Sequence, residues 1–134
     1  MIIEILFASC YVVAVIISLW SMFRIKGFLA GTPAIADIPC LDRFKALVRQ
    51  QMYLVLLFIP FIIVGIVTGI VMVNRYGMPG LGAVLLVNAL IFGLGKCQKK
   101  FEKRARSIPT GSVIIAHEYQ RVVVSWGKKP LPDF

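Results

Sequence analysis

The chain has 134 residues, of which 59% are hydrophobic and 16% are charged, and it carries a net charge of +9. Soluble domains are about half apolar and about a quarter charged. A soluble fold of this size could not remove so much apolar surface from water. The composition therefore excludes an ordinary soluble domain and predicts an all-α integral membrane protein, which we expect in a bacterial inner membrane.

Three apolar blocks, at residues 2–23, 52–73 and 78–95, are each about the length of a membrane-spanning helix. Such a helix needs about 20 residues at a rise of about 1.5 Å per residue. We therefore divide the chain into a first transmembrane helix at 1–24, a loop at 25–38, a stalk with the second transmembrane helix at 39–74, a turn at 75–79, a third helix with a basic stalk at 80–106, and a tail at 107–134.

Start and stop signals extend the second and third helices beyond the apolar blocks. Asp37 is a candidate N-cap, and Pro39 suits the first turn of the helix that follows. The third helix should continue through the basic run and end before Pro109. Because the turn at 75–79 is short, these two helices should form an antiparallel hairpin that extends into the cytoplasm as a two-helix stalk.

The tail contains the stretch SVIIAHEYQRVVVSW at residues 112–126, which is rich in β-branched and aromatic residues. This composition predicts one or two short β-strands. Two strands alone are marginal in water. The tail should therefore need a partner surface, either another subunit or the stalk.

The distribution of cations predicts the direction of the spans. No Lys or Arg precedes the first span, five lie between residues 24 and 49, only Arg75 lies in the second connection, and nine follow residue 95. Lys and Arg accumulate on the cytoplasmic side of membrane proteins. The N-terminus and the turn at 75–79 should therefore lie outside, and the first loop and the tail inside.

Small and weakly polar residues are expected to pack the helices, because lipid gives apolar helices no hydrophobic reason to associate. Pairing across the short turn places Gly65 opposite Ala89 and brings Asn88 close to Thr68. Asn88 should therefore hydrogen-bond Thr68 or the helix backbone, and a bond to another subunit is the alternative. The full set of predicted packing residues is Ala14, Ser18, Gly65, Thr68, Gly69, Gly82, Asn88, Ala89 and Gly93.

The basic run after the third span is expected to lie against anionic lipid headgroups, which attract cations by about 1 kcal/mol per residue, or to dock a cytoplasmic partner. Nucleic acid is disfavoured, because Phe101 is the only aromatic residue available for base stacking. The predicted docking residues are Lys96, Lys99, Lys100, Lys103, Arg104 and Arg106.

No motif for catalysis, cofactor binding or metal binding is found in the sequence. His117 is the only histidine, and Cys10, Cys40 and Cys97 lie far apart with no metal-ligand spacing. We therefore expect no enzyme, no cofactor and no metal site.

The leading hypothesis is a small non-catalytic subunit of a larger membrane complex. Its helices would pack on other membrane subunits or on copies of itself, and its basic stalk and tail would dock a cytoplasmic partner. Two alternatives remain open. The topology of three spans with a basic C-terminal region resembles the three-helix phage holins, which implies a self-assembling pore former. A small channel or carrier is the other, although Ser9, Ser18, Thr68 and Asn88 are the only polar residues available to it.

Overall fold

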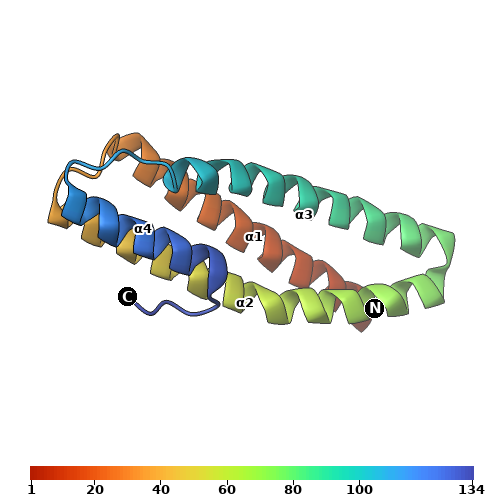
Figure 1. Ribbon diagram of the computed structural model, residues 1–134. Coiled ribbons are helices and arrows are strands. Elements are labelled where there is room, and N and C mark those ends of the chain that lie inside the picture. The colour runs from red at the N-terminus through yellow and green to blue at the C-terminus, as the bar shows by residue number, and fades with distance from the viewer.

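The structure, a computed structural model of all 134 residues, contains four helices and no sheet (Figure 1). The helices are α1 (Ile2–Gly31), α2 (Ile38–Tyr76), α3 (Met78–Ala105) and α4 (Val113–Lys128). The first three are long and apolar enough to cross a membrane. The predictions of an all-α chain and of three candidate spans are therefore confirmed.

The three long helices form one elongated bundle in which each helix contacts the other two (Figure 1). α2 and α3 run back along each other from the turn at Gly77, and α1 lies between them. At the opposite end, α4 lies along the first half of α2. We call these the turn end and the basic end. The basic end comprises the last turns of α1 and α3, the first turns of α2, and α4.

The hairpin between α2 and α3 closes through a single residue. Gly77 has a φ of +62°, in the left-handed region that glycine adopts without steric cost. Gly80 is also required by space, because a Cβ there would lie 2.5 Å from the carbonyl oxygen of Met72. The close approach of the last turn of α2 to the first turn of α3 therefore requires glycine at both positions.

α1 is longer than the sequence predicted, because it continues to Gly31 through most of the expected loop at 25–38. The glycines of this stretch favour a loop, but the packing of its apolar side chains keeps it helical. Ile25 is fully buried, and the rings of Phe28 and Phe44 lie 5.9 Å apart. The remaining link, residues 32–37, is fixed by backbone hydrogen bonds between Ile35 and the segment at 109–111.

The prediction of strands in the tail is wrong, because residues 113–128 form α4. Ser112 caps the helix by accepting a hydrogen bond from the backbone N–H of Ile115 at 3.3 Å. Ile115, Tyr119, Val122 and Trp126 are all buried, and their spacing is that of one helix face. This apolar face packs on α2, which outweighs the β propensity of the branched side chains.

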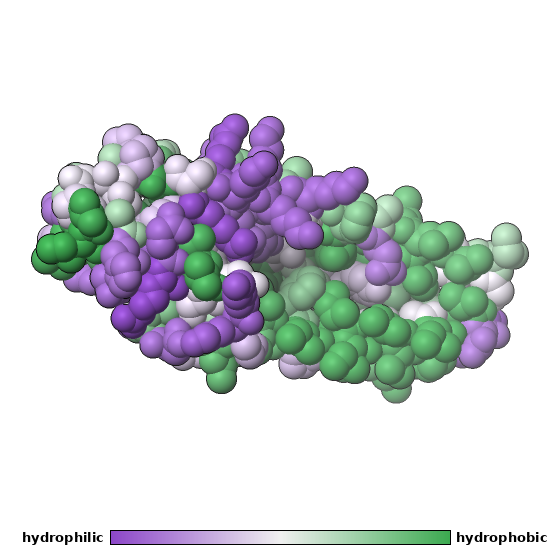
Figure 2. All heavy atoms as spheres, viewed as in Figure 1, coloured by the Kyte–Doolittle hydropathy of each residue, from purple (hydrophilic) through white to green (hydrophobic).

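The main hydrophobic core lies at the basic end. Its thirteen residues are Ile25, Ile35, Leu41, Phe44, Leu47, Val48, Met52, Ala105, Ile108, Ile115, Tyr119, Val122 and Trp126. Elsewhere the large apolar side chains of the three long helices mostly point outward. Figure 2 shows this division as a hydrophobic half toward the turn end and a hydrophilic half toward the basic end. The predicted two-helix stalk is thus a four-helix unit with a core of its own.

Candidate functional site

Exposed aromatic side chains mark two levels along the bundle. Trp20 and Tyr53 are exposed near the basic end, and Tyr76 is exposed at the turn end. The stretch of α2 from Tyr53 to Tyr76 is about 34 Å long at about 1.5 Å per residue, close to the ~30 Å hydrocarbon core of a bilayer. Because Trp and Tyr favour the membrane–water interface, these levels delimit the part of the bundle that fits a bilayer.

A polar junction joins the three long helices close to the level of Trp20 and Tyr53. Ser21 Oγ donates a hydrogen bond to Gln51 Oε1, and Gln51 Nε2 donates to the Ser21 carbonyl at 3.3 Å. Gln98 Nε2 donates to Ser21 Oγ at 2.9 Å and to Glu102 Oε1 at 3.1 Å. Ser21 and Gln51 are buried, so these bonds offset the cost of removing their polar atoms from water.

Sequence reasoning missed this junction, since Gln51 and Gln98 stand at the edges of apolar blocks and read as stalk residues. The sequence did contain one signal for the junction, because Gln51, Gln98 and Ser21 lie at the same depth in the three predicted spans. A cavity of about 200 Å³ lies beside the junction. Ser18, a predicted packing residue, lines this cavity together with Gly95.

The glycines of α2 face α1 in the middle of the bundle. A Cβ on Gly65 would lie 3.3 Å from the ring of Tyr11, and one on Gly69 would lie 3.4 Å from the ring of Phe7. The predicted pairing of Gly65 with Ala89 is thus replaced by a contact with an aromatic side chain of α1. Ala14, one turn beyond Tyr11, is almost fully buried.

Of the partners expected for Asn88, the backbone bond forms and the bond to Thr68 does not. Asn88 Nδ2 donates to the hydroxyl of Tyr11 at 3.2 Å and to the Val84 carbonyl at 2.8 Å. Thr68 Oγ1 donates instead to carbonyls of its own helix, Val64 at 2.8 Å and Gly65 at 3.1 Å. Tyr11 is therefore the partner that sequence reasoning missed, because the hairpin register left α1 out of account.

The three small residues predicted on α3 point away from the rest of the chain. Gly82, Ala89 and Gly93 are exposed, and nothing lies within 4 Å of a Cβ built on either glycine. They share one helix face by their spacing. Within one copy of the protein they pack against nothing.

The predicted docking cations divide into two groups. Lys96, Lys99, Lys100, Lys103 and Arg104 are exposed and form no ion pair. Lys96 lies 4.9 Å from the ring centroid of Phe92, which is a cation–π contact. Arg106 instead turns toward α4, where its guanidinium lies 4.8 Å from the Trp126 ring centroid and 3.9 Å from Glu102.

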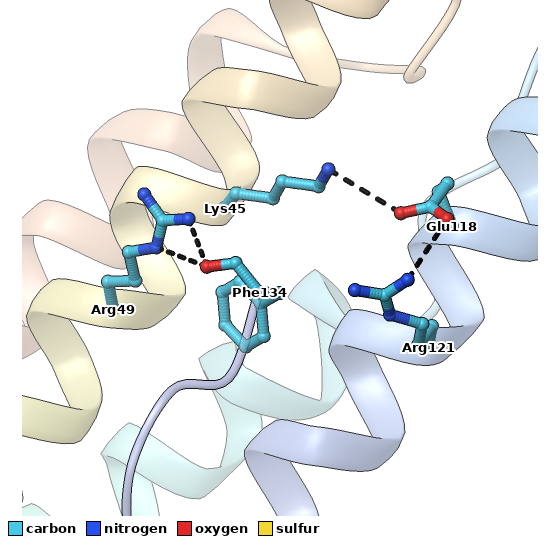
Figure 3. Close-up of polar contacts among 5 residues, drawn as sticks. All are labelled: Lys45, Arg49, Glu118, Arg121 and Phe134. Carbon is cyan, nitrogen blue, oxygen red and sulfur yellow. Dashed lines mark hydrogen bonds and ion pairs between the residues drawn. The ribbon is translucent and has the colours of Figure 1, made fainter.

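Polar contacts hold α4 and the last residues against α2 (Figure 3). Lys45 Nζ lies 3.5 Å from Glu118, which also pairs with Arg121 at 3.4 Å. Arg49 Nε donates to the Phe134 carbonyl at 2.8 Å, and its guanidinium lies 5.5 Å from the Phe134 ring centroid. These contacts flank the apolar face of α4, so α4 is fixed as part of the bundle.

The starts of α2 and α4 expose a group of large apolar side chains that we call the apolar tip. It consists of Ile38, Val113 and Ile114, which are 67%, 86% and 80% exposed. The bonds between Ile35 and the 109–111 segment place these two starts at the same end of the molecule. Ile38 lies about 22 Å along α2 from the aromatic level at Tyr53, at about 1.5 Å per residue.

Together, three long apolar helices with aromatic levels at both ends support an integral membrane protein. No cluster of His, Cys, Asp and Glu side chains could hold a metal ion, and all three cysteines are free. Comparisons with protein families, curated proteins and solved structures find no match to this chain.

Proposed function

We propose that the protein is a non-catalytic subunit of a larger membrane complex, with its N-terminus outside and its basic end in the cytoplasm of a bacterial cell. The apolar tip is the observation that carries this proposal. Lipid cannot cover side chains held about 22 Å beyond the aromatic level by a helix rising about 1.5 Å per residue. A large exposed apolar group far from the bilayer fits a protein contact.

The apolar tip stands on a rigid base. The core of the basic end is complete without Val113 and Ile114, and the ion pairs of α4 hold the helix in place. Packing within this chain therefore does not require either of these two side chains. The partner should present a complementary apolar patch to the tip.

The outward face of α3 supports a second contact, within the membrane. Gly82, Ala89 and Gly93 leave a shallow, small-residue surface, and such surfaces let helices of neighbouring subunits approach closely. The basic run on α3 would also lie next to anionic headgroups. Both features suit a subunit that is embedded among others.

Site-specific photo-crosslinking in native membranes tests the cytoplasmic contact. A photoreactive residue at Ile114 should give one discrete crosslinked product, whereas the same residue at Val124, which is exposed on the same helix, should give none. The double variant Val113→Glu/Ile114→Glu should release the partner in mild detergent, and Val124→Glu should retain it. Equal crosslinking at 114 and 124 would refute the proposed docking surface.

A holin-like pore is the alternative that the small-residue face of α3 also allows, with copies of this chain as the neighbours. Induced expression separates the two. A pore former stops growth abruptly, and Gly82→Leu/Gly93→Leu would abolish that effect. A complex subunit leaves growth unchanged or is degraded when its partners are absent.

A further inference from the structure

A groove runs between α1 and α2 at the basic end, on a part of the surface that sequence reasoning did not single out. Its volume is about 540 Å³. It is lined by Phe23, Arg24, Gly27, Phe28, Arg43, Ala46, Leu47 and Gln50. Two guanidinium groups thus share a groove whose other walls are mainly apolar.

The groove begins beside the polar junction. Arg24 and Gln50 are each within one turn of Ser21 and Gln51, and Arg24 Nε donates to Gln50 Oε1 at 3.2 Å. Exposed Phe23 and Trp20 lie on α1 next to this opening. In a bilayer bounded by the aromatic levels, the groove would therefore start at the edge of the hydrocarbon core and extend through the headgroup layer.

The two guanidinium groups are not paired with a carboxylate inside the groove, and Asp37 is near enough to feel the charge of Arg43. No carboxylate lines the groove, and neither Arg24 nor Arg43 forms an ion pair. Gln50 accepts the hydrogen bond from Arg24 through its side-chain oxygen, which holds the guanidinium at the opening. Guanidinium groups match phosphate oxygens in geometry and bind them by paired, charge-assisted hydrogen bonds.

The shape of the groove leaves room for a ligand. Nothing lies within 4 Å of a Cβ built on Gly27, and Phe28 behind it is fixed by its contact with Phe44. The exposed lysines of α3 differ in this respect. They line none of the main surface pockets, so they can attract an anionic surface but do not enclose one molecule.

We propose that this groove binds the headgroup of one anionic phospholipid. The phosphate contacts Arg24, the outer part of the headgroup reaches Arg43, and the acyl chains descend along Phe23 and Trp20. This inference rests on the membrane placement of the proposed function, but not on the partner at the apolar tip.

Native mass spectrometry of the purified protein tests the site, with phosphatidylglycerol as the probe and phosphatidylcholine as the zwitterionic reference. Arg24→Gln/Arg43→Gln should weaken binding of the first phosphatidylglycerol by about tenfold or more, as expected for lost hydrogen bonds between charged groups. The control Lys99→Gln/Lys103→Gln removes the same charge from α3 and should change this affinity less than about threefold, as for screened surface charges.

Gly27→Leu provides a second variant that fills the groove without changing charge, and it should weaken phosphatidylglycerol binding by a similar factor. Arg24→Lys/Arg43→Lys should retain part of the binding. Equal losses in the two Gln double variants, or equal affinity for the two lipids, would overturn the proposal.

Free glycerol 3-phosphate distinguishes a lipid site from a phosphate site. It should not displace the lipid at millimolar concentration, because it lacks the acyl chains; displacement would refute a lipid site. The photo-crosslink at Ile114 should be unchanged in Arg24→Gln/Arg43→Gln, so failure of the lipid site and failure of the partner contact give separate results.

Discussion

At the scale of single residues, Tyr119 is the side chain that joins α4 to the end of α3. It is 2% exposed, and its ring lies 4.9 Å from that of Phe44. Its hydroxyl donates to the Ala105 carbonyl at 2.5 Å and accepts from the backbone N–H of Ile108 at 3.0 Å. One phenol therefore satisfies two backbone groups where α3 ends and the chain turns back.

Tyr119→Phe should destabilise the docking of α4 by about 1–3 kcal/mol, because it leaves buried backbone groups without partners while keeping the ring. Hydrogen exchange of the α4 amides is the measurement, and faster exchange confined to α4 and residues 105–108 is expected. Tyr53→Phe, on the exposed face of α2, is the matched control. Unchanged exchange in Tyr119→Phe would show that the hydroxyl contributes nothing to docking.

The same residue predicts a dependence on alkaline pH. Burial raises the pKa of Tyr119 above its ordinary value of 10.0. The unfolded segment then loses the phenolic proton before the docked one does, so stability is fully present below about pH 10 and falls as pH rises through the higher pKa. Exchange of α4 amides should therefore accelerate above about pH 10, beyond the intrinsic rate, in the native protein and less in Tyr119→Phe.

At the scale of helices, the single-residue turn makes the α2–α3 hairpin depend on close backbone approach. Gly80→Ala would place a Cβ 2.5 Å from the Met72 carbonyl oxygen, which real structures do not tolerate. We expect the change to cost about 1–3 kcal/mol, as for other overpacked sites, and to open the turn end.

The rate of disulfide cross-linking between cysteines introduced at Val73 and Leu81 would report that opening, and it should fall in Gly80→Ala. Gly82→Ala is the control, since nothing lies within 4 Å of its Cβ. A cross-linking rate that fell equally in both variants would contradict the assignment of the close contact to Gly80.

At the scale of the whole molecule, every Lys and Arg except Arg75 lies toward the basic end, and most of the exposed apolar side chains lie toward the other end (Figure 2). The proposed topology follows from this asymmetry by the positive-inside tendency. Cys97 is exposed on α3 at the inner aromatic level, next to the basic run. A maleimide that cannot enter cells should leave Cys97 unmodified in intact cells and modify it after lysis. It should modify Met78→Cys, exposed at the turn end, in both conditions. Modification of Cys97 in intact cells would reverse the topology.

Much of the fold could be predicted from local sequence. Asp37 was expected as an N-cap, and it accepts a hydrogen bond from the Cys40 N–H at 2.9 Å, which lowers the pKa of its carboxyl. α2 begins at Ile38 and α3 ends at Ala105, each within one residue of the expected boundary. Helix ends depend on capping residues, prolines and the length of the apolar run. These features are local, so they can be recognised without knowing which helices are neighbours.

The candidate sites were harder to predict from the sequence. The groove at Arg24 and Arg43 requires two helices to meet in one register, and the apolar tip requires α4 to be a helix rather than a strand. The helical period of Ile115, Tyr119, Val122 and Trp126 is present in the sequence of α4, but the β-branched composition of the same stretch favours strands. The contact with Phe44 decides between the two.

The sequence by itself determined three long apolar helices and the end of the molecule at which the positive charge collects. Both depend only on runs of neighbouring residues. The tertiary structure alone decided that α1 lies between α2 and α3, that Tyr11 rather than Ala89 meets Gly65, and that Ser21, Gln51 and Gln98 join. These features depend on which helix faces meet, and uniformly apolar helices leave that choice to shape and to a few buried polar groups.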